Sequence, residues 1–76
     1  MPRRYLPREV LRVLEYLGWR IVRTRGSHAR LKREDGSRPV TLALYRRELP
    51  PKTLNSILKQ SGLSLNEFSE AGEEVL

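Results

Sequence analysis

His28 is the only histidine in this 76-residue chain, and it directly follows a Gly26-Ser27 pair inside a long basic run. Histidine is the side-chain type that most readily exchanges protons near neutral pH, so a lone histidine among cations is a candidate general base. Arg23 and Arg25 precede it in the sequence, and no acidic residue stands between them and the histidine. A Gly-Ser turn can also leave backbone N–H groups free to bind an anion. This stretch therefore predicts a phosphate-binding site that carries one proton acceptor.

RNA is the polyanion for which a single histidine is chemically useful. The ribose 2′-OH is an internal nucleophile next to each phosphorus, and a general base that removes its proton gives cyclising cleavage without a metal. Nearby cations stabilise the extra charge of the phosphorane, as oxyanion-hole donors do. We therefore expect His28 to be the catalytic base. Tyr45, Lys32 or water could protonate the leaving 5′-oxygen, and the sequence does not choose among them.

The charge is divided unevenly along the chain. Residues 1–47 hold 13 Lys and Arg against 4 Asp and Glu, whereas residues 48–76 hold 2 against 5. A basic half of this density is typical of a protein with a polyanionic partner. Most of the cations are arginine, whose planar guanidinium suits phosphate, although an arginine-rich genome is an alternative explanation for that bias.

Composition excludes several other classes of function. The chain has no cysteine, so neither disulfides nor a cysteine-ligated zinc can support the fold, and one histidine leaves only carboxylates as further metal ligands. We expect no metal and no other cofactor. No apolar run approaches the ~20 residues that cross a bilayer, and no signal-peptide pattern opens the chain, so we expect a cytoplasmic protein without a membrane partner.

The elements that position His28 follow from apolar spacing and turn residues. We expect a basic lead-in containing Arg3 and Arg4, then helices over about Pro7–Leu17 and from Pro51 to Gly62, strands over Trp19–Thr24, His28–Arg33 and Val40–Tyr45, and a short helix from Leu65 to about Glu70 before a frayed acidic tail. Asp35-Gly36 predicts a type I′ hairpin turn. The first strand does not alternate cleanly, so its buried face stays unassigned. Residues 1–76 are expected to form one domain.

The second strand alternates well. Ala29 and Leu31 point to one side, whereas His28, Arg30 and Lys32 point to the other. Two apolar helix faces and one apolar sheet face must cover each other. The expected fold is therefore α+β, an α-β-β-β-α order with a three-stranded antiparallel sheet, both main helices on one face, and a short extra C-terminal helix. His28, Arg30 and Lys32 would lie on the open face.

The aromatic residues divide into two groups. Four of them are expected to pack in the core or on helices rather than to stack on bases: Tyr5, Tyr16, Trp19 and Phe68. Tyr45 is as well suited to one role as to the other. Arg46 and Arg47, like the arginines of the lead-in, either contact phosphate or keep the protein soluble.

A set of short motifs carries a family resemblance. In chain order they are Gly18-Trp19, Arg23, Gly26-Ser27-His28, Asp35-Gly36, Val40-Thr41-Leu42, Leu49-Pro50, Leu54, Ile57-Leu58-Lys59-Gln60 and Gly62-Leu63-Ser64. From about Leu6 to Phe68 the chain resembles the HicA (YcfA-like) messenger-RNA interferase toxins. Gly-Ser-His alone is a weak signal, but its position between the first two strands, with the Ile-Leu-Lys-Gln-x-Gly-Leu helix end downstream, makes it more specific.

The resemblance implies a double-stranded-RNA-binding-domain-like fold and translation-independent cleavage of messenger RNA. It implies that the histidine of Gly26-Ser27-His28 is essential, and that a HicB-type antitoxin covers the active face. Many members carry a Pro-x-His step after the third strand, where this chain reads Ala43-Leu44-Tyr45. Either Tyr45 replaces that histidine, or activity here is weaker or reduced to binding.

The expected site therefore consists of catalytic His28 and RNA-binding Arg23, Arg25, Gly26, Ser27, Arg30, Lys32 and Tyr45. The alternative to a nuclease is a non-catalytic RNA-binding module that reads duplex shape through phosphate and 2′-OH contacts. Against it, the second long helix offers only Lys52 and Lys59 as cations. A third reading is a basic protein-interaction surface that meets an acidic antitoxin.

Overall fold

The computed structural model of this protein describes residues 4–76, so Arg3 of the expected lead-in lies outside the described residues. The elements in chain order are α1 (Pro7–Tyr16), β1 (Arg20–Arg25), β2 (His28–Lys32), β3 (Val40–Ala43), α2 (Pro51–Ser61) and α3 (Leu65–Val75). The strands form one antiparallel sheet in the order β1-β2-β3. This confirms the α+β order expected from the sequence.

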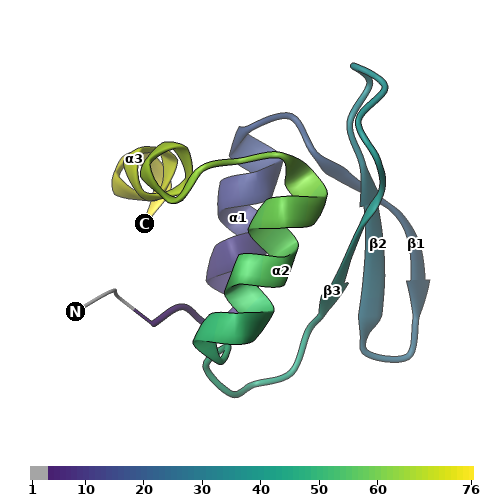
Figure 1. Ribbon diagram of the computed structural model, residues 1–76. Helices are drawn as coiled ribbons and strands as arrows, with labels where there is room; N and C mark the ends of the chain where they lie inside the picture. Colours follow the sequence, from purple (N-terminus) through teal and green to yellow (C-terminus); the bar gives the residue numbers. More distant parts are fainter. Residues whose placement is uncertain (1–3) are drawn as a thin grey trace.

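The helices all lie on one side of the sheet. Figure 1 shows α1 and α2 packed against it, with α3 on their far side and the opposite sheet face uncovered. The buried core between the helices and the sheet is mostly aliphatic, with Val10, Val13 and Leu14 from α1, Ala29, Leu31, Val40 and Leu42 from the sheet, and Leu54, Ile57 and Leu58 from α2. One face of the sheet is therefore buried and the other is exposed to solvent.

The junction of α1 and β1 is closed by a glycine. Gly18 has a φ of 98°, and the N–H groups of Gly18 and Trp19 donate to the carbonyls of Glu15 and Leu14 at 3.0 and 2.9 Å. These two hydrogen bonds pair carbonyls of the last helical turn, and the chain turns there toward the sheet. Trp19, 2% exposed, is thereby buried as expected, and the Arg33 guanidinium lies 5.0 Å from the centre of its ring.

A bulge in β1 explains why its sequence did not alternate. The pairing with β2 passes from Ile21↔Leu31 directly to Arg23↔Arg30, which leaves Val22 as the extra residue. Such an insertion reverses the face of every residue beyond it. Arg23 therefore shares the open face with Arg30, the residue it opposes.

The turn between β2 and β3 differs from the expected type I′ hairpin. Its connection runs from 33 to 39, and among the described residues no non-glycine has a positive φ, whereas type I′ needs one at Asp35 as well as at Gly36. The Asp35 carboxylate instead accepts the Ser37 N–H at 3.0 Å and pairs with Arg33 Nε at 2.8 Å. The hydrogen bond from the Ser37 hydroxyl, then that from the Ser37 N–H, and the charge of Arg33 hold the pKa of Asp35 below its ordinary value.

The C-terminal helix is longer than expected. α3 continues to Val75, because Phe68 and Ala71 are buried and Val75 is half-buried on one face of it. Phe68 packs edge-to-face on Tyr5, with ring centres 5.0 Å apart. The expected Ser64 capping box is present, since the Glu67 N–H donates to Ser64 Oγ at 3.1 Å. The tail beyond Glu70 is therefore helical and packed rather than frayed.

Two apolar side chains expected to be packed are exposed. Leu65 was expected to anchor the last helix, yet it is 47% exposed, because it lies at the first turn of α3 away from the buried face. Tyr16 is 56% exposed at the end of α1. The third strand ends at Ala43 rather than at Tyr45. The Leu44 N–H still donates to the Ser27 carbonyl, one position beyond the last ladder pair, His28↔Ala43.

Candidate functional site

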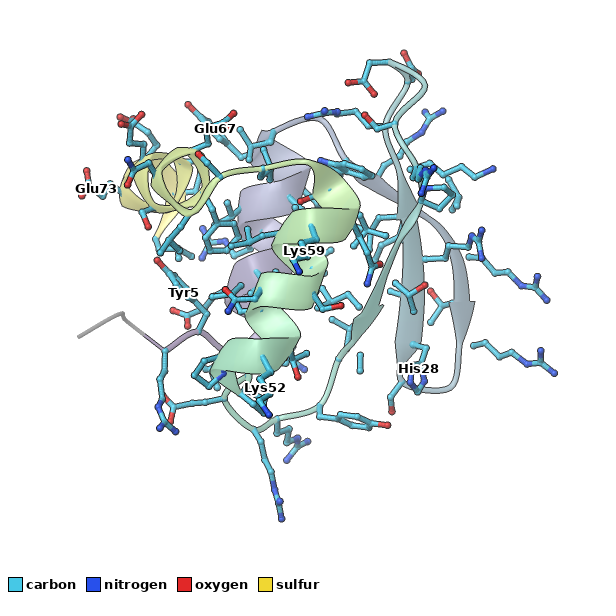
Figure 2. The ribbon with its side chains drawn as sticks, viewed as in Figure 1. Tyr5, His28, Lys52, Lys59, Glu67 and Glu73 are labelled. Carbon is cyan, nitrogen blue, oxygen red and sulfur yellow. The ribbon has the colours of Figure 1, made fainter. Side chains whose placement is uncertain are left out.

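A two-residue turn presents His28 to solvent. Arg25 and His28 oppose each other across the β1–β2 ladder, so Gly26 and Ser27 alone connect the strands. Gly26 has a φ of 59° and Ser27 does not have a positive φ, the combination typical of a type II′ turn, which favours glycine at its first position. Figure 2 shows His28 next to this turn, at the end of the sheet.

The open face of β2 carries the alternation expected from the sequence. Ala29 and Leu31 are fully buried beneath the helices, whereas His28, Arg30 and Lys32 are exposed. This confirms the predicted division of faces. The bulge in β1 then brings its arginines to the same side, because Arg25 opposes His28.

A shallow depression of about 180 Å³ lies on this face, and we call it the basic depression. It is lined by Arg23, Arg25, His28, Ala29, Arg30 and Thr41. No carboxylate is among these lining residues, so nothing in the depression competes with a phosphate for its three guanidinium groups. The arrangement offers an anion site with an imidazole inside it.

Tyr45 lies against the histidine from the other side. The rings of His28 and Tyr45 are 6.0 Å apart between centres and stand at 84° to each other, an edge-to-face contact. Tyr45 is 55% exposed. It follows the end of β3, where the hydrogen bond from the Leu44 N–H to the Ser27 carbonyl, at 2.6 Å, ties the two segments together. The histidine therefore has cations on one side and a phenol on the other.

The expected site residues are not all brought together. Arg23, Arg25, Arg30 and His28 line the basic depression, Gly26 and Ser27 form the adjoining turn, and Tyr45 contacts His28. Lys32 shares the face but opposes Arg20 at the far end of the strand, outside the depression. Arg20 there pairs with Glu34 at 3.4 Å.

Sequence reasoning missed two residues of this face. Thr41 lines the basic depression and opposes Arg30, while Ala43 opposes His28. A signal for them was available, since the alternation of β3 had put both residues on the side opposite Val40 and Leu42. Neither side chain carries a charge or titrates, which is why a search for chemically active groups passed over them.

Two further observations bear on metals and membranes. Across residues 4–76, no cluster of three or more His, Cys, Asp or Glu side chains could hold a metal ion. Within the same residues, every helix is too short or too polar to cross a membrane.

Comparison with known proteins gives one positive finding. The model of a family described as HicA toxin of bacterial toxin–antitoxin systems matches residues 7–63. The match covers well over half of the chain, from the first residue of α1 to just beyond α2, and includes His28. It ends before α3, and so earlier than the resemblance read from the sequence, which extended to Phe68. No curated protein matches the chain.

Proposed function

The chain belongs to the HicA toxin family, and from that premise we propose that this toxin of a toxin–antitoxin system is a metal-independent endoribonuclease that cleaves messenger RNA. The observation that carries the proposal is the exposed His28 imidazole in a depression lined by three arginines and no carboxylate. A site of this composition attracts the RNA backbone and offers it one group able to take a proton.

The proposed reaction is an internal transfer. His28 takes the proton of a ribose 2′-OH, the 2′-oxygen bonds to the neighbouring phosphorus, and the bond from phosphorus to the 5′-oxygen breaks. The leaving 5′-oxygen receives a proton from an acid, so the products are a 2′,3′-cyclic phosphate and a free 5′-hydroxyl. Arg23, Arg25 and Arg30 bind the phosphate and stabilise the charge that develops on its oxygens. DNA lacks the 2′-OH and is not cut.

For the acid, the geometry favours Tyr45 over Lys32. The Tyr45 ring contacts the His28 ring, whereas Lys32 is four residues further along the strand, roughly 13 Å away at 3.3 Å per residue. We assign the Tyr45 hydroxyl to the leaving 5′-oxygen and give Lys32, which lies outside the basic depression, no part in the reaction. Gly26 and Ser27 hold the turn that keeps His28 exposed.

Membership of the family also implies an antitoxin partner. We propose that this partner is a HicB-type protein that covers the basic depression. The positive first half of the chain favours an acidic contact surface on that partner.

The test is a cleavage assay on single-stranded RNA in the presence of EDTA. We expect the wild-type protein to cut, and His28→Ala to stop cutting without loss of thermal stability, because the side chain is exposed. Lys32→Ala, on the same strand face, serves as the matched control and keeps most of the activity. Salt-sensitive RNA binding without cleavage by the wild type would instead support a non-catalytic RNA-binding module, and equal cutting by His28→Ala would remove the histidine from the mechanism.

A further inference from the structure

A second concave surface adjoins the proposed active site on the side away from the basic depression. It is a groove of about 690 Å³ between the end of β3, the connection to α2, and the starts of α1 and α2. We call it the side groove. Its volume lies in the range typical of pockets that hold a small organic group.

We propose that the side groove binds one unpaired nucleobase of the RNA strand, next to the phosphate held at His28. The inference rests on the proposed function and adds to it a subsite for one base. A base can enter such a groove only when it is not paired in a duplex. The toxin would accordingly act on single-stranded segments of RNA.

Continuity with the catalytic histidine is the first argument. Two residues belong to both surroundings: Tyr45 lines the groove and contacts the His28 ring, and Ala43 lines the groove and opposes His28 in the sheet. His28 thus lines the basic depression and at the same time contacts a residue of the side groove. Figure 2 shows His28 and Lys52, which marks the first turn of α2, at the same end of the molecule.

The chemistry of the lining is the second argument. Pro7 and Leu49 are buried apolar members, Ala43 is half-buried, and the Tyr45 ring is exposed beside them. The exposed Tyr45 ring beside these apolar residues suits a base, since every base has a π-face that can stack. The groove is also held in shape, because the Leu49 N–H donates to the Tyr5 carbonyl at 2.8 Å.

The charged residues of the lining suit a base that is flanked by phosphates. Glu48 lines the groove together with Arg46 and Arg47. Its carboxylate repels a phosphate but can accept a hydrogen bond from the amino group of a base. The two arginines are exposed and complement the phosphates that flank an inserted base. The groove therefore suits an uncharged base in an RNA strand whose phosphates are charged.

The experiment combines protein variants with RNA lacking bases. Thr53 lines the groove from the first turn of α2 and is exposed, so Thr53→Trp fills the groove without disturbing the core. Asn55→Trp, exposed on the same helix and outside the groove, is the matched control. Binding is measured by fluorescence anisotropy with a single-stranded 2′-O-methyl oligonucleotide, which cannot be cut, and with a ribose-phosphate oligomer of equal length that carries no bases.

We expect Thr53→Trp to weaken binding of the oligonucleotide about tenfold, which is typical of the loss of one stacked base, and to leave binding of the base-free oligomer unchanged. Asn55→Trp should change neither. Equal binding of the oligonucleotide by the wild type and Thr53→Trp, or equal binding of both oligomers by the wild type, would overturn the proposal. Cleavage of ordinary RNA is measured in parallel. If the wild type cuts RNA but Thr53→Trp binds the oligonucleotide normally, only the base-binding proposal is refuted. If Thr53→Trp binds more weakly but the wild type does not cut RNA, only the nuclease proposal is refuted.

Discussion

Replacement of Arg30 by glutamine should lower the salt dependence of RNA binding by one phosphate contact. For single strands, each contact contributes a slope of about −0.7 to the dependence of log K on log salt concentration. If each of the three arginines of the basic depression contacts one phosphate, together they contribute a slope of about −2.1, or roughly a 20-fold loss of affinity between about 50 and 200 mM salt. Arg30→Gln should reduce the magnitude of the slope by about 0.7.

The measurement uses the His28→Ala background, so that RNA stays intact, and a fluorescently labelled single strand titrated at several salt concentrations. Lys32→Gln is the control, because Lys32 lies on the same face of β2 two residues further on but outside the depression. Its slope should equal that of the parent. If Lys32→Gln lowers the slope as much as Arg30→Gln does, phosphate binding extends along the whole strand face and the depression has no special role.

Three further predictions concern stability. Phe68→Ala should destabilise the fold by about 3–5 kcal/mol in urea unfolding, because the ring is fully buried against Tyr5, whereas exposed Leu65→Ala should change it little; similar losses for both would contradict the packing of α3. Gly26→Ala should lower the free energy of unfolding by about 1–2 kcal/mol. The loss comes from the positive φ alone, since an added Cβ meets no atom within 4 Å. An unchanged melting temperature would refute the assigned turn. The folded-state pKa of Asp35 is lowered below 3.8, so the ionised carboxylate stabilises the fold above that pH, and this stabilisation is lost as the pH falls through the folded-state pKa. The melting temperature of the wild type should therefore fall more steeply with pH across this range than that of Asp35→Asn. The same pH dependence in both proteins would exclude a contribution from Asp35.

The fold could be read from local patterns where those patterns are regular. The alternation of residues 28–32 assigned both faces of β2 correctly, and the Gly18 and Ser64 signals located helix ends. The bulge at Val22 could not be read, because an inserted residue interrupts the period without a signal of its own.

The errors at the C-terminal end have a different cause. The charge of the last residues indicated a frayed tail, yet Phe68, Ala71 and Val75 lie three and four positions apart and form an apolar stripe. The acidic composition of these residues concealed the helical spacing of their apolar side chains. The side groove was out of reach for another reason, since it forms only where Pro7 of α1 lies beside residues 43–53, which are distant from it in the sequence.

The exposed first strand has a consequence for solubility. β1 lies at the edge of the sheet, and an uncovered edge can pair with the same edge of another copy and start aggregation. The Val22 bulge interrupts its regular ladder, and the mutual repulsion of arginine side chains opposes the approach of a second strand. The arginines that we propose to bind RNA thus also oppose the pairing of two copies of this chain. Replacing the arginines of β1 with neutral residues should weaken binding to nucleic acid and increase self-association of the free protein.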